Sequence, residues 1–459
     1  MSVFSLSNLK KTWYYLQKNG IRNAVWAVLE RIGQEQEVYT WQEPDEKTLS
    51  FQREHSASLR ISIVVPAYRT KKEHLEAMLN SVSRQSYPHW ELIVADAGGT
   101  AESVQAWAKK NGICLRKAAD ASNLAEWMDQ SIVLCTLSEN KGISANTNAG
   151  IELAAGDVVG LLDHDDLLTA NALWEMADCL EKEKKRGKQK LVLFSDEDKC
   201  DGAASRFYEP NFKPDFDGEL LLTNNYICHF TVIETAFLKE LKLRSGFDGA
   251  QDYDLMLRAY AAGGQFVHVP KVLYHWRCHE ASTASNPQSK RYAYEAGRRA
   301  LEDYCLRKGW KATVSGLKHL GFYREDYEDS VFCQRPEIGI WAKPLLGGRD
   351  VFGIRHPKGF LVSGLYENDG SMRYAGLRKG YSGPMHRAAL QQSAPAADLR
   401  SMEVCSALKE RYAQTIAELK EACQGLPTAA REKKILQKSM EFCKEATAAG
   451  YGILWDPQA

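Results

Sequence analysis

The sequence predicts an α/β fold with a mostly parallel sheet that is covered by helices on both faces. Short apolar runs rich in β-branched residues, the first of them Ile61–Tyr68, alternate with amphipathic segments of helical periodicity. Such alternation is typical of β-α-β units. Several apolar runs end in an acidic residue, and open α/β sheets bind ligands at the carboxyl ends of their strands. The sequence therefore predicts a ligand site at that edge.

The predicted strands and helices alternate along the middle of the chain. In order they are the strand Ile61–Tyr68, a helix around His74–Ser86, the strand Glu91–Asp96, a helix near Ile143–Ala155, a strand ending at Asp163, a helix after Thr169 and a strand ending at Asp198. The first of these helices has one apolar face, made by Leu75, Met78, Leu79 and Val82.

Changes in composition divide the chain into three predicted segments. Residues 1–58 are expected to be helical, because apolar residues recur among Lys and Arg at helical spacing. Residues 59–318 hold the α/β domain. Residues 319–459 are expected to be α-rich, with a Gly-rich stretch followed by long charged helices. The first segment either docks on the main domain or touches a membrane surface through basic and aromatic residues, and both interpretations are open.

Composition excludes several classes of protein. Lys plus Arg and Asp plus Glu each total 59, so the formal net charge is zero and no basic field for nucleic acid is expected. The 11 cysteines contain no CxxC pair, which argues against a disulfide framework or a zinc cluster. No run of about 18 apolar residues predicts a membrane span. A cytoplasmic protein is expected, with a peripheral position at the inner face of the cell membrane as the alternative.

Motifs of several common enzyme classes are missing from the chain. The sequence has no GxGxxG after a strand, no GxxxxGK[ST], no HExxH and no GxSxG. Dehydrogenases, P-loop ATPases, zinc proteases and serine hydrolases therefore lose their main support.

Acidic residues at or beside strand ends are the candidate catalytic and ligand-binding residues. Asp96 precedes two glycines and is either a ligand contact or a turn residue. Asp163, Asp165 and Asp166 follow an apolar run; three carboxylates so close together favour a divalent cation, Mg²⁺ or Mn²⁺, although a solvated turn is the alternative. Asp252 opens an amphipathic helix, where a carboxylate acts either as a general base or as a favourable charge at the helix start.

A basic cluster follows the last predicted strand. His275 and His279 stand four residues apart, with Arg277 between them. Pro270, just before them, predicts a loop here, so the spacing does not establish a metal site. A guanidinium and imidazoles are suitable contacts for a diphosphate.

In this order, the motifs resemble the bacterial family 2 glycosyltransferases of the GT-A fold, in the branch that builds surface polysaccharides. The resemblance covers roughly residues 59–285 and rests on ISIVVPAY, ELIVADAGG, ENKGISANTNAG, GLLDHDD, SDEDK, NFKPDF, NNYICH, GAQDYDLMLR and PKVLYHWRCHEASTA. It implies an inverting glycosyltransferase that moves a hexosyl or related sugar. The donor would be a nucleoside-diphosphate sugar, the metal Mn²⁺ or Mg²⁺, and the acceptor a glycan or lipid-linked glycan. Other polysaccharide-assembly enzymes are further expected partners.

The resemblance also implies a role for individual residues. Asp252 would be the catalytic base, and Asp163 and Asp165 the DxD pair at ribose and metal, with Asp166 in support. Asn225, Tyr226 and His229 would lie on the acceptor side, and the SDEDK segment would contact sugar or acceptor. The nucleotide and diphosphate contacts would be Pro66, Tyr68, Asp96, Lys141, Ser144, Asn148, His275 and Arg277, with His279 as a further metal ligand.

Three features depart from the family pattern and leave an alternative open. The usual Asp-Asp-Gly-Ser turn reads Asp96-Ala97-Gly98-Gly99, and Gln251 stands where many relatives have Glu. Residues 119–139 are longer than the usual link to the Gly-Ile-Ser motif, and we expect them to form a flexible lid or a subfamily contact. The C-terminal segment weakly resembles part of a second transferase unit but lacks its acidic motifs, which predicts a noncatalytic remnant or a structural cap. The alternative function is a noncatalytic protein that binds sugar nucleotides or assists assembly.

Overall fold

The computed structural model describes residues 39–118, 127–278, 291–317, 320–342, 388–389 and 398–455. The predicted N-terminal helix, the Gly-rich stretch and His279 fall wholly or mostly outside these residues. The chain divides into two compact units. We call residues 38–216 and 225–304 the sheet unit, and residues 217–224 with those from 305 onward the C-terminal unit.

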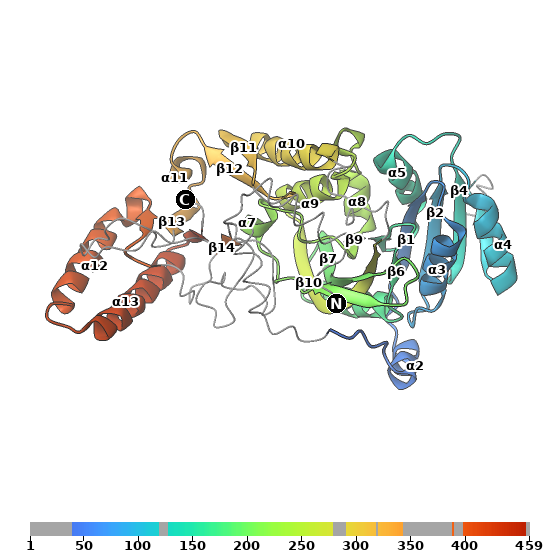
Figure 1. Cartoon of the computed structure of the whole chain (residues 1–459), viewed down its shortest axis with the longest axis horizontal. Helices are drawn as coiled ribbons and strands as arrows, with labels where there is room; N and C mark the ends of the chain where they lie inside the picture. Colours follow the sequence, from blue (N-terminus) through green and yellow to red (C-terminus); the bar gives the residue numbers. More distant parts are fainter. Residues whose placement is uncertain are drawn as a thin grey trace, which may run out of the picture. The chain divides into compact units, whose positions relative to one another are not determined.

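The sheet unit is built on a large mixed sheet (Figure 1), in the strand order β3-β4-β2-β1-β5-β9-β7-β10-β6, with β8 paired to β7. Its strands are β1 (Ile61–Ala67), β2 (Trp90–Asp96), β3 (Cys114–Lys117), β4 (Ser131–Thr136), β5 (Val158–Leu161), β6 (Leu167–Leu168), β7 (Leu191–Cys200), β8 (Phe207–Asn211), β9 (Thr231–Glu234) and β10 (Gln265–Arg277). Its helices are α2 (Glu46–Glu54), α3 (Lys72–Ser83), α4 (Ala101–Asn111), α5 (Ile143–Leu153), α6 (Ala172–Lys185), α8 (Thr235–Leu241), α9 (Gln251–Ala261) and most of α10 (Arg291–Arg307).

Helices cover both faces of the parallel half of the sheet, as predicted. Strands β3, β4, β2, β1 and β5 are all parallel to their neighbours. The predicted apolar face of α3 is buried with Ile63 and Leu92 on one side. On the other side, α5 approaches so closely that a Cβ on Gly150 would lie 2.7 Å from the side chain of Val64. Glycine there lets the helix pack against the strands.

The structure corrects two expectations for the sheet unit. His275 and Arg277 lie in strand β10 and not in a loop, because the strand continues past Pro270 through irregular register between Val269 and Tyr274. Proline is tolerated where a ladder hydrogen bond is already missing. Part of the predicted lid, residues 131–136, is strand β4 between β2 and β3. Strand β9 runs antiparallel between β5 and β7, which the sequence pattern did not indicate.

The C-terminal unit contains more strands than the α-rich region that the sequence predicted. Its two long helices lie within the charged segment where they were expected. Beside them, a four-stranded sheet has the order β14-β16-β13-β15. The elements are α7 (Gly218–Leu221), β11 (Ala312–Gly316), β12 (Tyr323–Tyr327), α11 (Val331–Gln334), β13 (Ile338–Ala342), β14 (Ala388–Ala389), β15 (Met402–Val404), α12 (Lys409–Ala422), α13 (Thr428–Ala448) and β16 (Gly452–Trp455).

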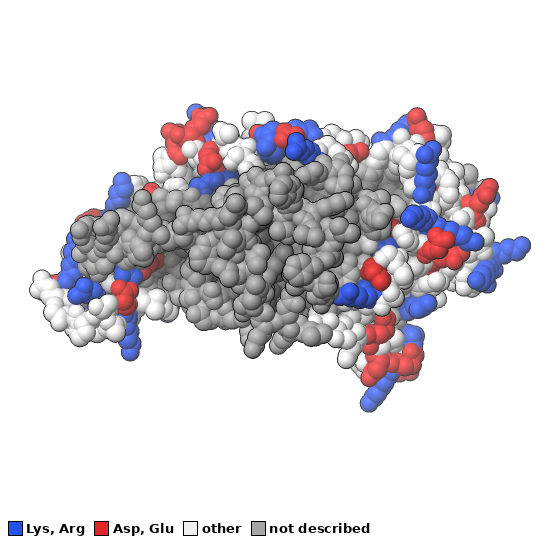
Figure 2. All heavy atoms as spheres, viewed as in Figure 1, with Lys and Arg blue, Asp and Glu red and all other residues white. Residues whose placement is uncertain are grey.

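Charge on the surface is mixed. Figure 2 shows basic and acidic side chains interspersed over the described part of one face, in keeping with the zero net charge of the sequence. Within the described residues, no helix is both long and apolar enough to cross a membrane. All 11 cysteines lie in described residues, and each is a free thiol.

Candidate active site

The candidate site lies at the carboxyl edge of the parallel strands. The register of β1 and β2 sets Ala67 opposite Asp96, and β5 pairs with the other side of β1. Tyr68 and Asp163 follow the ends of β1 and β5, so the polar residues after these three strands gather along one edge. Strand order reverses around β1, which is where α/β sheets of this kind leave room for a ligand.

Asp96 is buried and serves the turn that follows β2. Its carboxylate accepts hydrogen bonds from the backbone N–H groups of Gly98, Thr100 and Ala101 at 3.0, 3.2 and 2.9 Å. These bonds hold the start of α4. Beside this turn, Tyr68 is 39% exposed and lies under the Arg69 guanidinium, 5.0 Å from the ring centroid. Of the expected nucleoside contacts, Tyr68 is thus the open surface, whereas Pro66 lies within β1 and is partly buried.

The residues expected from ENKGISANTNAG fix helix α5. The side-chain amide of Asn148 donates to the carbonyl of Leu243 at 2.8 Å and accepts from its N–H at 2.9 Å. The hydroxyl and backbone N–H of Ser144 donate to Asp248. Lys141 is exposed, with its ammonium 3.2 Å from Glu139. These contacts tie α5 to the loop before α9, and Lys141 alone of the three presents its side chain to solvent.

The acidic turn after β5 is held from beneath by β10. Asp166 is buried, and its carboxylate accepts from the Tyr274 hydroxyl at 2.6 Å and from the backbone N–H of Arg277 at 2.7 Å. The Arg277 guanidinium donates to the carbonyls of Asp165 and Gly202. Burial, together with the charges of Asp165 and Asp163, raises the pKa of Asp166 well above its ordinary value. Asp166 and Arg277 therefore anchor the turn.

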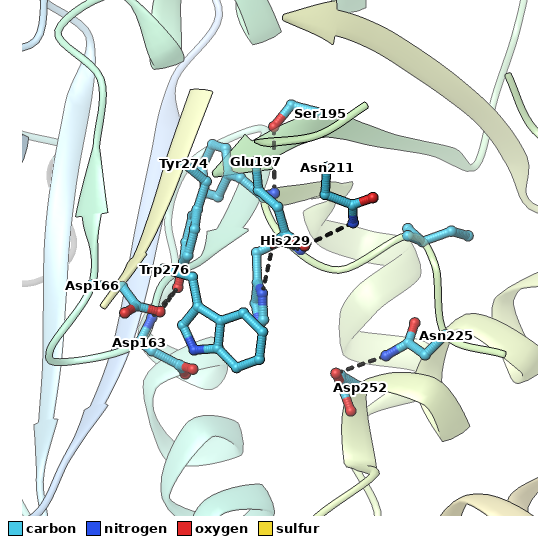
Figure 3. A network of polar contacts seen from close by, with 12 residues as sticks. Asp163, Asp166, Ser195, Glu197, Asn211, Asn225, His229, Asp252, Tyr274 and Trp276 are labelled. Atoms are coloured by element: carbon cyan, nitrogen blue, oxygen red, sulfur yellow. Dashed lines mark hydrogen bonds and ion pairs between the residues drawn. The ribbon is translucent and has the colours of Figure 1, made fainter. Parts of the chain in front are cut away.

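Asp163 lies near Trp276 and His229 (Figure 3) and is partly exposed. Burial raises its pKa, and the charges of Asp165 and Asp252 raise it further, against the lowering effect of His229. The electrostatic coupling to Asp252 is notable because the two residues are 89 positions apart in the sequence. The fold therefore brings the two carboxylates near each other.

Asp252 lies in the first turn of α9, which begins after a constrained backbone. Gly249 has φ +96°, and a Cβ there would lie 2.6 Å from the Tyr292 ring and 3.1 Å from Ala293, so glycine is required. Gln251 then accepts the Gly249 N–H at 2.8 Å. The Asp252 carboxylate accepts from the side-chain amide of Asn225 at 2.8 Å.

Asp254, two residues further on, has a structural role. Its carboxylate is 1% exposed and is shared by the guanidinium groups of Arg244 and Arg258. Arg258 also donates to the carbonyls of Leu241 and Lys242 at 2.6 Å. This cluster clamps α9 to the loop before it, and so fixes where Asp252 points.

A cluster of charged side chains that the sequence did not predict lies beside Asp163. It consists of Glu197, Lys213 and His229. Glu197 on β7 accepts from the backbone N–H and ring of His229 at 2.7 and 3.2 Å. The ammonium of Lys213 is fully buried and donates to the carbonyls of Ile227 and His229. The imidazole stacks on Tyr274 with ring centroids 4.9 Å apart (Figure 3). The motifs SDEDK, NFKPDF and NNYICH were the sequence signal, but nothing in them indicated that these three residues meet.

These contacts set opposite pKa shifts. Burial raises the pKa of Glu197, but the Lys213 charge and the hydrogen bond from His229 outweigh it and bring the pKa to about 2. Burial lowers the pKa of His229, but the hydrogen bond and charge of Glu197 raise it to about 9. Burial lowers the pKa of Lys213. An ionised Glu197 therefore holds His229 in its charged form beside Asp163.

His275 lies deeper than the sequence predicted. It is 3% exposed and hydrogen-bonds through Nδ1 to Asp198, which also accepts from the Tyr39 hydroxyl at 2.6 Å. The rings of Trp41 and Phe207 pack against the imidazole, with centroids 5.0 and 4.2 Å away. His275 thus has a local packing role.

Two carboxylates are available to a cation in the described part of the site. No group of three or more His, Cys, Asp or Glu side chains in the described residues is arranged to hold a metal ion. Asp163 and Asp165 nonetheless offer hard oxygen ligands, and their mutual repulsion fits a divalent cation between them. Mg²⁺ often takes only one or two carboxylates and completes its shell with water and substrate phosphate.

Comparison with known proteins identifies the family of the segment that contains strands β1, β2 and β5. The model described as glycosyl transferase family 2 matches residues 62–241. These residues form a glycosyl transferase family 2 domain. The domain includes the strands β1, β2 and β5 and the acidic turn, whereas Asp252 and β10 follow it in the chain.

Two relatives of this segment are much longer than the chain. Over 255 residues the chain is 37% identical to the uncharacterized protein y4gI of Sinorhizobium fredii, covering 55% of this chain and 26% of that protein. Over 256 residues it is 34% identical to the O-antigen biosynthesis protein RfbC of Myxococcus xanthus, covering 56% and 19%. The chain therefore spans about a quarter and a fifth of these two relatives. The crystal structure of S. aureus TarS 1–349 in complex with UDP-GlcNAc aligns with a TM-score of 0.40 and 20% identity, over 54% of this chain and 67% of that one.

Substituting the two aspartates of α9 should change the free energy of unfolding by unequal amounts. Asp254→Asn removes the charge that two arginines share, so we expect the free energy of unfolding to fall by about 3 kcal/mol, as when one partner of a buried ion pair is lost. Asp252→Asn keeps a hydrogen-bonding side chain at a less buried position, so we expect a change below about 1 kcal/mol. Urea unfolding followed by tryptophan fluorescence measures both; equal losses would contradict this division of roles.

The pKa of Glu197 predicts how stability depends on pH. Because its folded pKa of about 2 lies below the ordinary 4.5, the ionised group stabilises the fold above pH 4.5 and loses that effect as the pH falls toward 2. The stability difference between the parent and Glu197→Gln should therefore be largest near pH 5 and shrink below pH 4.5. It should also fall as the pH rises toward 9, because the raised pKa of His229 depends on Glu197. Urea unfolding at stepped pH measures this.

The matched control for that experiment is Glu209→Gln. Glu209 also pairs with a lysine, Lys199, but its side chain is 61% exposed. We expect a small stability difference with little pH dependence, because exposed ion pairs contribute little. A Glu197→Gln difference that grows as the pH falls below 4.5 would contradict the account.

Proposed function

We propose that the chain is a metal-dependent, inverting glycosyltransferase that moves one sugar from a nucleoside-diphosphate donor to a glycan acceptor in the synthesis of a surface polysaccharide. The observation that supports the proposal is that Asp163, at the carboxyl edge of the family 2 segment, lies close enough to Asp252 for the two carboxylates to interact electrostatically (Figure 3). The O-antigen biosynthesis protein among the relatives supports the polysaccharide class.

In this mechanism Asp252 is the general base. Its carboxylate takes the proton of an acceptor hydroxyl as that oxygen attacks the anomeric carbon of the donor. A bond forms between the acceptor oxygen and the anomeric carbon, while the bond from that carbon to the diphosphate oxygen breaks. Attack opposite the leaving group inverts the anomeric configuration, and the leaving nucleoside diphosphate carries away the electron pair.

The leaving diphosphate gains negative charge, which the site must stabilise. A divalent cation held by Asp163 and Asp165 would neutralise the charge on the phosphates. Of the chain's own residues, His229 is kept positive by Glu197 and lies beside Asp163. Its fixed charge favours an anionic donor in this space.

We assign the remaining expected residues to binding or support according to their contacts. Tyr68 is exposed beside the Asp96 turn, so we propose that it stacks on the base or ribose. Asp96, Ser144 and Asn148 shape the donor pocket, since their side chains hold the loops around it. Arg277 and His275 are buried, which favours supporting roles over direct contact with the diphosphate: Arg277 holds the acidic turn, and His275 packs locally beside Asp198.

Calorimetric titration of nucleoside-diphosphate sugars into the purified protein tests donor binding. We expect one sugar nucleotide to bind with Mn²⁺ or Mg²⁺ and to bind at least tenfold more weakly with chelator, because two carboxylates would otherwise face the phosphates. Asp165→Ala should weaken the metal-dependent binding, while Asp252→Asn should bind donor normally and lose transfer.

The control for that titration is Asp178→Asn, on the exposed part of α6, where the carboxylate pairs with Lys182. It should bind donor as the parent does. If a folded protein bound none of the sugar nucleotides, the account would give way to a noncatalytic assembly protein. Equal binding with metal and with chelator would contradict the metal dependence but not the transferase function.

A further inference from the structure

Asn225 contacts the proposed base, Asp252, through the nitrogen of its side-chain amide but not through the oxygen. Its N–H group donates to Asp252 Oδ2 at 2.8 Å. Its oxygen, Oδ1, is buried and has no hydrogen-bond partner in the described structure. A buried amide oxygen without a donor is costly, so such atoms in native proteins commonly await water, an ion or a ligand.

The orientation of this amide follows from chemistry. An ionised carboxylate only accepts hydrogen bonds, so the N–H₂ group of Asn225 must face Asp252 and the oxygen must face away from it. Figure 3 shows Asn225 and Asp252 approaching from different elements, with the second carboxylate oxygen of Asp252 directed away from the amide. The two residues therefore offer two separate acceptor atoms, one on each side of the hydrogen bond that joins them.

We propose that Asn225 positions Asp252 for proton abstraction and binds, through its amide oxygen, a second donor on the acceptor adjacent to the attacking hydroxyl. The inference rests on the proposed transferase function. It specifies the acceptor class as a sugar in which the attacking hydroxyl has a neighbouring hydroxyl or amide N–H.

The geometry explains why the two roles belong to one residue. The nitrogen and oxygen of an amide share one carbon, so a group bound to Oδ1 lies next to the group that reaches Asp252. An acceptor sugar whose hydroxyl donates to Asp252 can place its neighbouring donor at Oδ1. The acceptor is then held at two points, which fixes the direction of attack.

The test is steady-state release of nucleoside diphosphate from the sugar nucleotide that the protein turns over, with p-nitrophenyl glycosides as acceptors. For Asn225→Ala we expect kcat/KM for the acceptor to fall about 10- to 100-fold, as for loss of hydrogen bonds to a charged or buried group. The KM for the donor should stay within about twofold, because Asn225 does not touch the acidic turn after β5.

A second readout separates positioning from a merely structural role. Asn225→Asp sets a carboxylate at hydrogen-bonding distance from Asp252, and two such carboxylates share a proton. The acid limb of the pH profile of kcat/KM should therefore move about one unit or more to higher pH. Other titratable groups near these two residues are Asp163, Cys228 and the His229–Glu197 pair with Lys213, and none of them is changed by the substitution.

The matched control is Asn171→Asp. Asn171 also donates its amide to a carboxylate, that of Glu175, at 3.2 Å, but it lies at the start of α6. The same substitution there should leave the acid limb unchanged.

A third readout uses the acceptor itself. The p-nitrophenyl glycoside that lacks the hydroxyl beside the attacking one should be about tenfold poorer for the parent protein and no poorer for Asn225→Ala. Parent-like acid limbs and acceptor kinetics in both Asn225 variants, while Asp252→Asn is inactive, would overturn the inference alone. If the parent protein turned over none of the sugar nucleotides, both the proposed function and the inference would be overturned.

Discussion

The concentration of negative charge after β5 is the constraint on which the site depends. Asp163, Asp165 and Asp166 stand within four residues, and Asp252 adds a fourth charge from α9. Repulsion of this size is tolerated because the sheet unit supplies compensation. Asp166 is withdrawn into the fold by hydrogen bonds from β10, and His229 brings a positive charge to the open side.

That compensation is itself assembled from distant segments. Lys213 and Glu197 are both buried, and each offsets the cost of burying the other. Lys213 also fixes the backbone on either side of Cys228 through its bonds to two carbonyls. The imidazole of His229 is thus fixed by its backbone, by Glu197 and by stacking on Tyr274. A charge held in this way needs little reorganisation when a ligand arrives.

Sequence pattern predicted the parallel half of the fold because strands such as Ile61–Ala67 are buried on both faces and read as continuous apolar runs. It failed at β10, because Pro270 indicated a loop and a bulge is a tertiary feature. Spacing after strand ends brought attention to Asp163 and Asp252, whose carboxylates interact electrostatically in the structure. The sequence did not predict that Asn148 and Asp96 hydrogen-bond to backbone groups, because such partners depend on how the loops fold. The pairing of Glu197 with His229 joins positions 32 apart through an antiparallel arrangement that no local periodicity encodes.

The position of bond cleavage tests the central claim most directly. Phosphorus NMR of the protein incubated with its sugar nucleotide and a glycan acceptor identifies the phosphorus products. The account predicts a nucleoside diphosphate, formed in step with a new glycosidic bond, because attack takes place at the anomeric carbon. Appearance of a nucleoside monophosphate together with a sugar 1-phosphate would mean cleavage between the phosphates, and would contradict a glycosyltransferase.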